Sequence, residues 1–176
     1  MDIKNQNFYI TTRTPLRVSF FGGGTDFENY YKKKSGGVLS VTINKFVYVT
    51  IKRHNKLFNE NYRINYSSVE HRDKLNKIDN SIVRECLKKF PIAPPLSITI
   101  SSDIPSNSGL GSSSSITVGL LKALHVARGE KINNYCLAEE ACQIEIDIIK
   151  NNIGKQDQYA AAFGGLNFIK FKKLNV

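Results

Sequence analysis

The chain has no tryptophan, a single methionine and three cysteines among its 176 residues. Cys86, Cys136 and Cys142 form an odd set whose spacing matches neither a disulfide framework nor a zinc-binding pair. The three histidines lie far apart in the sequence and add no metal-binding pair. We therefore expect free, reduced cysteines and no zinc site.

Long apolar runs are also missing. No stretch approaches the ~18 residues that a membrane-spanning helix requires. The first ten residues, MDIKNQNFYI, lack the basic-then-apolar layout of a signal peptide. Hydrophobic residues make up 41% of the chain and charged residues 23%, which is ordinary for a soluble globular protein. We expect a cytoplasmic protein that does not contact a membrane.

Acidic residues are in short supply. The chain has 15 Asp and Glu against 25 Lys and Arg, so its formal net charge is +10. This excess favours acidic partners such as nucleic acid, anionic lipid or a phosphorylated small molecule. The lysines occur in short groups within 32–34, 88–89 and 170–173, which suits solvated surface. Charge alone therefore does not choose among the three kinds of partner.

The first half of the chain has the composition of β-strands. Runs rich in Val, Ile, Thr, Tyr and Phe predict strands, and Pro15 separates the first two. Asn44-Lys45 forms either a hairpin turn or a bend within one strand. With a last strand near the C-terminal end, the expected strands are Phe8–Thr12, Leu16–Phe21, Gly37–Ile43, Phe46–Arg53, Tyr62–Tyr66, Leu96–Ile100 and Leu166–Phe171.

The second half is mostly helical, because apolar residues recur there every three or four positions. The expected helices are Ile78–Phe90 before Pro91, Ser112–Arg128 before Gly129, and the stripe Leu137–Ile148 capped by Asn133 or Asn134. Strands followed by helices predict an α+β fold, with a mixed or antiparallel sheet packed against helices. The length allows one sizeable core, and we expect residues 1–176 to form one domain.

The most unusual stretch is GLGSSSS, residues 109–115, between the expected strand Leu96–Ile100 and an amphipathic helix. It joins a strand to a helix and is therefore no interdomain linker, and a helix needs only one N-cap residue. Gly109 and Gly111 permit positive φ and bring bare backbone close to a ligand. The helix start adds unpaired N–H groups and the positive end of the helix dipole. We interpret the stretch as a phosphate-binding loop, with plain capping as the alternative.

Two common phosphate loops do not fit this spacing. A Walker A loop requires a lysine directly after its second glycine, and none follows Gly111. A dinucleotide fingerprint requires a third glycine where this chain has Ser114. A different nucleotide-binding loop is therefore expected.

Three segments resemble the motifs of the GHMP kinases, a family that includes galactokinase, homoserine kinase, mevalonate kinase and phosphomevalonate kinase. PSNSGLGSSS at 105–114 is similar to the family's P-x-x-x-G-L-G-S-S loop, on which the ATP phosphates lie. RTPLRVSFFGGGTDF at 13–27 looks like its first motif, and GKQDQYAAAFGG at 154–165 resembles the segment with the catalytic aspartate. The three occur in family order over nearly the whole chain.

The resemblance implies residues that bind ATP, Mg²⁺ and a phosphoryl acceptor. The ATP-binding residues are Pro105, Ser108, Gly109, Leu110, Gly111, Ser112, Ser113 and Ser114. The metal ligands are Ser113 and Glu145, with Glu140 and Asp147 as rival carboxylates. The catalytic residues are Asp157, which takes the proton of the acceptor, and Arg17, which stabilises the transfer. The acceptor-binding residues are Gly23, Gly24, Thr25, Asp26 and Lys155.

The residue types in the first motif narrow the class of phosphoryl acceptor that the resemblance implies. Galactokinase-like members carry G-E-H-T-D where this chain has G-G-G-T-D at 22–26. That form, together with G-K-Q-D-Q-Y-A-A and F-G-G, is similar to the D-glycero-D-manno-heptose 7-phosphate kinases, which phosphorylate the anomeric oxygen. A fucokinase-like or other sugar kinase is the alternative. The resemblance thus implies ATP and a phosphorylated sugar as partners, without nucleic acid or membrane.

The resemblance covers an N-terminal portion of the family. Members are usually longer and carry a C-terminal domain with a third glycine-rich motif, which this chain lacks before Val176. We therefore expect this portion to be inactive by itself. A nucleotide-binding relative without catalysis would need neither Arg17 nor Asp157, and both are present. A nucleic-acid-binding module would suit the charge but would not need the phosphate loop.

Overall fold

The computed structural model describes residues 7–54, 59–105 and 108–172. The described strands are β1 (Tyr9–Phe21), β2 (Gly36–Arg53), β3 (Tyr62–Asn65), β4 (Val69–Arg72), β5 (Leu96–Ser102) and β6 (Leu166–Phe171). They form one sheet in the order β1-β2-β5-β3-β4, and β6 pairs with the first part of β2. β3 and β5 run parallel and the other described neighbours antiparallel, so the sheet is mixed.

The first two strands are longer than the sequence predicts. β1 runs unbroken through Pro15, with a shift of register between Pro15 and Arg17. The prediction of two strands was wrong because proline, which has no N–H to donate, is tolerated at such an irregularity. The shift also breaks the alternation of faces, and the consecutive residues Leu16 and Arg17 are both buried. β2 continues through Asn44-Lys45. Of the two predicted alternatives, the bend within one strand is confirmed and the hairpin turn is wrong.

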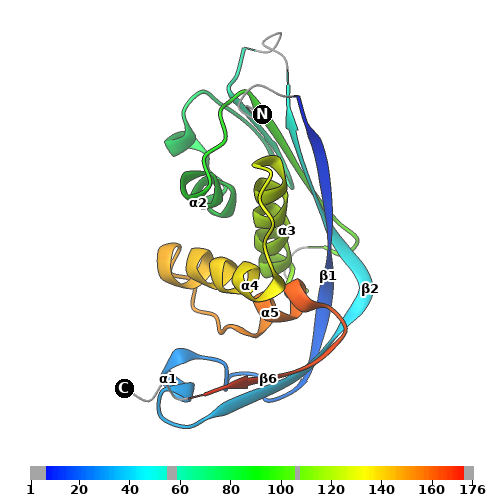
Figure 1. Cartoon of the computed structure of the whole chain (residues 1–176), viewed down its shortest axis with the longest axis vertical. Helices are drawn as coiled ribbons and strands as arrows, with labels where there is room; N and C mark the ends of the chain where they lie inside the picture. The colour runs from blue at the N-terminus through cyan, green and yellow to red at the C-terminus, as the bar shows by residue number, and fades with distance from the viewer. Residues whose placement is uncertain (1–6, 55–58, 106–107, 173–176) are drawn as a thin grey trace.

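Helices α2 to α5 cover one face of the curved sheet (Figure 1). The helical segments are α1 (Glu28–Tyr31), a 3₁₀ turn η2 (Leu75–Lys77), α2 (Ser81–Lys89), α3 (Ser112–Ala127), α4 (Asn134–Cys142), a π-helical segment η3 (Gln143–Ile148) and α5 (Gln156–Phe163). Asn133 is the N-cap of α4, since its Oδ1 accepts from Cys136 N at 2.8 Å. The stripe expected over 137–148 therefore begins as α-helix and continues as π-helix.

The central helix α3 packs directly on β1 and β2. Leu120, Leu121 and Leu124 are fully buried in the main core, and each contributes roughly 2 kcal/mol by burial. Gly119 permits the close approach, because a Cβ there would lie 2.7 Å from Thr14 Oγ1. At the helix start, Ser115 Oγ donates to Pro15 O at 2.9 Å. These contacts fix the beginning of α3 beside the irregular part of β1.

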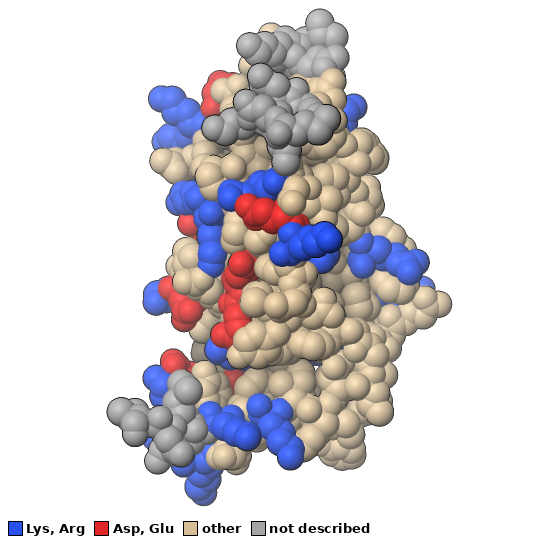
Figure 2. All heavy atoms as spheres, viewed as in Figure 1, with Lys and Arg blue, Asp and Glu red and all other residues tan. Residues whose placement is uncertain are grey.

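Three expectations from composition can be compared with the structure. The cysteines are free, as predicted. Among the described residues, none of the helices combines the length and apolar character needed to cross a membrane. On the face drawn in Figure 2, Lys and Arg lie in separate groups with Asp and Glu between them.

Candidate active site

Arg17 lies in the first of the three motifs and contacts residues of the other two. Its side chain, 11% exposed, leaves β1 just after the register shift. Nε and Nη2 donate to Asp157 Oδ1 at 2.8 and 2.6 Å, and Nη1 donates to Gly109 O at 2.8 Å. The main-chain N–H of Arg17 donates to Leu110 O at 3.1 Å. One arginine therefore holds the predicted phosphate loop and Asp157 in a fixed relation.

The start of α3 is bare backbone next to this pair. Gly111 precedes the helix with φ 77°, and no side chain caps the helix there. A Cβ at Gly111 would lie 3.4 Å from both Asp157 Oδ2 and Arg17 Cγ, so glycine keeps this space open. The first amides of a helix have no acceptor within it and carry the positive end of the dipole. The arrangement can therefore hold an anion beside Asp157.

The remaining residues of the predicted loop form its outer part. Pro105, Ser108 and Gly109 are exposed, while Leu110 is half-buried against the main core. Gly109 has φ 73° and open space where a Cβ would stand, which leaves its backbone accessible. Ser106 and Asn107 of the motif lie outside the described residues.

The serines that follow Gly111 divide between the core and the site. Ser114 and Ser115 are buried, each with 1% exposure. Ser112 is half-buried and Ser113 is exposed, so these two remain accessible to a ligand. Ser113 Oγ also donates to Glu145 Oε1 at 2.7 Å. The serine run thus anchors the helix with its later residues and faces the site with its earlier ones.

Glu145 is a fully buried carboxylate in the π-helical segment η3. Burial raises its pKa above the ordinary value, against hydrogen bonds from Ser113, Ser114 and Gln158 that lower the pKa. π-Helical segments are frequent at functional sites. Of the two rival carboxylates, Glu140 pairs with His125 at 2.8 Å and Asp147 is exposed. The structure therefore brings Glu145 to Ser113 and engages Glu140 elsewhere.

Gln158 makes a contact with Glu145 that the sequence did not predict. Its buried Nε2 donates to Glu145 Oε2 at 2.8 Å, so both oxygens of Glu145 are held. Gln158 follows Asp157 directly on α5, and one helix therefore positions both carboxylates. The sequence signal is weak, because α5 was not predicted as a helix and its packing against η3 is a long-range contact.

Asp157 lies in the first turn of α5 with one oxygen engaged. Both donors from Arg17 reach Oδ1, which leaves Oδ2 without a bond from that arginine. Burial is the main cause that raises the pKa of Asp157, Arg17 lowers the pKa in part, and the charge of Asp26 raises it further. The result is a fixed carboxylate that binds a proton more readily than an exposed aspartate.

The 22–26 turn is tied to α5 through Asp26. This residue is 1% exposed, and its carboxylate accepts from Gly24 N at 3.0 Å and Gln156 N at 3.1 Å. Gly154 has to be glycine, because a Cβ there would lie 1.9 Å from Asp26 Oδ2. The first and third motifs therefore lie against each other beside Asp157.

Thr25 also holds the turn. Its hydroxyl donates to Gly22 O at 2.7 Å and accepts from Gly37 N at 3.0 Å. Gly23 and Gly24 are different, because a Cβ at Gly24 would meet nothing within 4 Å and one at Gly23 only Gln156 Nε2 at 3.9 Å. The open surface of the turn is therefore its main chain at Gly23 and Gly24.

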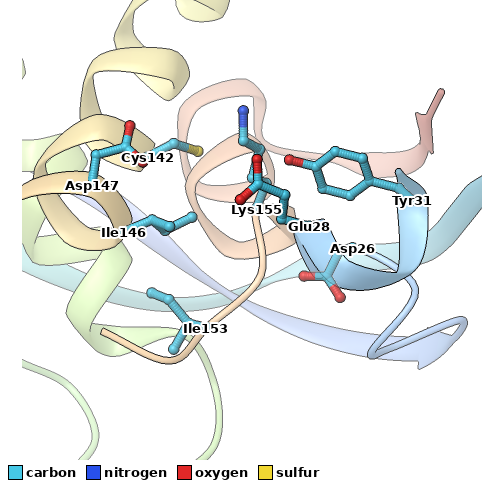
Figure 3. A pocket seen from close by; sticks show the side chains of 8 residues that line it. All are labelled: Asp26, Glu28, Tyr31, Cys142, Ile146, Asp147, Ile153 and Lys155. Carbon is cyan, nitrogen blue, oxygen red and sulfur yellow. The ribbon is translucent and has the colours of Figure 1, made fainter. Parts of the chain in front are cut away.

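Lys155 pairs with Glu139 of α4, and Asp157 with Arg17. The distance from Lys155 Nζ to Glu139 Oε1 is 3.5 Å. Lys155 also lines a cavity of about 140 Å³, together with Asp26 and Tyr31. In Figure 3 the Tyr31 hydroxyl points toward the Glu28 and Lys155 side chains across this cavity. Lys155 is thus next to Asp26, and its ammonium is partly neutralised.

Comparison with known proteins identifies similar sequences and folds. A protein named D-glycero-alpha-D-manno-heptose 7-phosphate kinase, from Campylobacter jejuni subsp. jejuni serotype O:2, is 39% identical over 176 residues, which cover 92% of this chain and 50% of that protein. A crystal structure described as a D-glycero-D-manno-heptose 1-phosphate kinase from Bacteriodes thetaiotaomicron superposes with a TM-score of 0.83 and 29% identity, over 96% of this chain and 58% of the other.

A more distant structure shares the fold. Lactococcus lactis galactokinase, complexed with galactose, has a TM-score of 0.70 and 22% identity over 89% of this chain and 42% of its own. The chain thus spans about half the length of the curated relatives it matches. The family model for the GHMP kinases N terminal domain matches residues 76–165. The chain therefore belongs to the GHMP kinases, as an N-terminal domain of that family.

Proposed function

We propose that this chain is the ATP-binding domain of a sugar kinase that transfers the γ-phosphoryl group of ATP to the anomeric hydroxyl of a heptose 7-phosphate. The observation that carries the proposal is the convergence at one helix start. The Arg17–Asp157 pair lies beside Gly111, and Ser113, two residues further, meets the buried Glu145. Phosphoryl transfer depends on positioning and charge neutralisation, which these groups supply.

The phosphates of ATP would lie against the amides of Gly109 to Ser114, with Ser113 and Glu145 holding Mg²⁺. A hydroxyl and a carboxylate are hard oxygen ligands, and Mg²⁺ in kinases takes one or two carboxylates plus substrate phosphates. Within the described ranges no group of three His, Cys, Asp or Glu could hold a metal, so phosphate oxygens and water would supply the other ligands. When bound, Mg²⁺ would offset charge on the phosphates.

Asp157 would take the proton of the C1 hydroxyl at its free Oδ2. Arg17 holds Oδ1 and would place its charge beside the attacking oxygen and the transferred group. General-base assistance of this kind is typically worth about 10²–10⁴ in rate. The planar guanidinium stays charged and can contact two oxygens at once.

The sugar would lie over the 22–26 turn. Gly23 and Gly24 offer open main chain, Thr25 and Asp26 shape the turn, and Lys155 lies at its far side. The formal net charge of +10 suits two anionic substrates. The two heptose-kinase relatives support a heptose phosphate as acceptor, although their names place its phosphate at C7 in one case and C1 in the other.

The proposal is tested by a coupled ADP-release assay against a panel of sugar phosphates. Because the relatives are about twice as long, the chain is assayed alone and mixed with the separately expressed remainder of the Campylobacter jejuni relative. We expect turnover with D-glycero-D-manno-heptose 7-phosphate in the mixture only. Turnover with another sugar instead would indicate a different GHMP sugar kinase. ATP binding without any turnover would indicate a nucleotide-binding domain only.

Replacing Glu145 with glutamine should weaken Mg²⁺-dependent ATP binding while stabilising the fold at neutral pH. Loss of a ligand or its support typically costs about 10–100-fold in metal affinity. The folded pKa of Glu145 is raised from 4.5, so folding favours the protonated form and stability falls as pH rises through the window above 4.5. Glutamine resembles the protonated form, so the gain in Tm should be larger at pH 8 than at pH 4.

The measurements are binding of a fluorescent ATP analogue with and without Mg²⁺ and thermal unfolding between pH 4 and pH 8. Glu140→Gln is the matched control, because this carboxylate pairs with His125 and lies away from Ser113. It should leave the effect of Mg²⁺ on ATP binding unchanged. Equal Mg²⁺ dependence in Glu145→Gln and the parent would remove Glu145 from the metal site.

A further inference from the structure

One side-chain atom of Gln156, the amide oxygen Oε1, has no hydrogen-bond partner within the part of the chain that the structure describes. Its Oε1 is shielded from solvent and unpaired, although the residue itself is half-buried. Leaving a buried acceptor without a partner destabilises the folded state. Other described side-chain atoms share this condition, so the surroundings of Gln156 have to indicate whether a ligand is its partner.

The surroundings of Gln156 are those of the acceptor site. It directly precedes Asp157 on α5, and its main-chain N–H donates to Asp26 Oδ2 at 3.1 Å. Its Nε2 lies 3.9 Å from the position that a Cβ on Gly23 would take, and a Cβ on Gly24 would meet nothing within 4 Å. The amide thus borders the open main chain of the turn and belongs to the residue next to Asp157, the proposed base.

The charges nearby decide what kind of group the amide can meet. Asp26 accepts from the Gln156 main chain and Asp157 is the next residue along α5, so an anionic group is disfavoured beside the amide. A neutral hydroxyl suits an amide, because it both donates and accepts a hydrogen bond. A rotation of the amide by half a turn exchanges Oε1 and Nε2, so either end can face the hydroxyl.

We propose that the Gln156 amide hydrogen-bonds one hydroxyl of the sugar acceptor and so determines which sugars fit the turn. This assignment rests on the proposed function, because it takes Asp157 to mark the acceptor position. It makes Gln156 a substrate-binding residue next to the catalytic pair. The phosphate of the sugar then lies elsewhere, away from these two carboxylates.

The test is a double-mutant cycle between Gln156 and the hydroxyls of the sugar, measured as binding without turnover. Calorimetry with a non-hydrolysable ATP analogue compares D-glycero-D-manno-heptose 7-phosphate with analogues that lack one hydroxyl each. For one analogue the parent chain should lose about fivefold in affinity, the value of a neutral hydrogen bond. Gln156→Leu should lose a similar factor for the complete sugar and nothing further for that analogue.

Two comparisons keep the result interpretable. Gln143→Ala, an exposed glutamine on η3, should bind every sugar as the parent does. The series of analogues on the unmodified chain gives a result even if Gln156→Leu does not fold. Additive losses at every hydroxyl would overturn the role of Gln156, as would a parent chain that does not bind the heptose phosphate. Coupling at one hydroxyl with no ADP release would uphold Gln156 and overturn only the proposed reaction.

Discussion

Replacing Asp157 with asparagine should lower kcat by at least about a hundredfold while ATP affinity stays within about twofold. Asparagine keeps the shape of the side chain and can still accept from Arg17, so the loop contacts at Gly109 and Leu110 should persist. What it removes is the oxygen that takes the proton. One measurement is steady-state ADP release by the chain mixed with the separately expressed remainder of the Campylobacter jejuni relative. The other is binding of a fluorescent ATP analogue.

The matched control is Asp79→Asn, an exposed carboxylate paired with Arg72 on the surface. It should leave kcat unchanged, and thermal unfolding of both variants shows whether the fold is retained. A kcat equal to that of the parent in Asp157→Asn would remove Asp157 from the chemistry. It would leave the phosphate loop and the ATP-binding proposal intact.

The pH dependence of the parent follows from the same carboxylate. The base has to be ionised, and burial raises its pKa above the usual 3.8, so the rate should fall on the acid side at a higher pH than for an exposed aspartate. The acid limb of kcat/KM against pH reports this pKa. Activity that stays constant down to pH 4 would contradict the raised pKa.

A second large effect is expected at Gly22, where a methyl group should remove a large part of the free energy of unfolding. The residue has φ +85°, and a Cβ would lie 1.9 Å from Gly37 O. The strained backbone costs about 1–2 kcal/mol by itself. Since the obstacle is main chain of β2 and cannot rotate away, the total loss should exceed about 4 kcal/mol. A domain whose free energy of unfolding is about 5–15 kcal/mol loses much of its margin.

Gly24→Ala separates the two causes. Gly24 has φ +91° but open space around the added methyl, so only the backbone strain of about 1–2 kcal/mol applies. Urea unfolding followed by circular dichroism measures both variants under the same conditions. Equal losses of stability in the two variants would show that the close approach of Gly22 to β2 does not hold the turn.

Local patterns accounted for much of the fold and for the outline of the site. The strand runs, the apolar stripes and the asparagine N-cap of α4 all depend on neighbours a few residues apart, and the structure has them close to the expected positions. The comparisons with known proteins show the GHMP kinase family that the three motifs implied. The unbroken passage of β1 through Pro15 was not predicted, because it depends on pairing with β2, which local propensity does not contain.

The site residues show the same division. Ser113 and Glu145 were predicted to lie close together as metal ligands; Ser113 Oγ is 2.7 Å from Glu145 Oε1, and their role as ligands stays a prediction. Gln158 and Gln156 were not predicted, because α5 is short and only weakly amphipathic in its sequence. Thr25 and Asp26 were predicted to bind the acceptor, and their hydrogen bonds to the main chain could not be read from the motif.

The sequence by itself determined the glycine- and serine-rich loop, the order of the motifs and the α+β class, since each depends on residue type and spacing along the chain. Only the tertiary structure decided that Arg17 meets Asp157 across 140 residues and that Glu145 is buried. It also decided that the turn at 22–26 is hydrogen-bonded to α5 through Asp26. The physical reason is that burial and paired charges arise from packing between distant segments, here from the seating of α3 on the irregular part of β1.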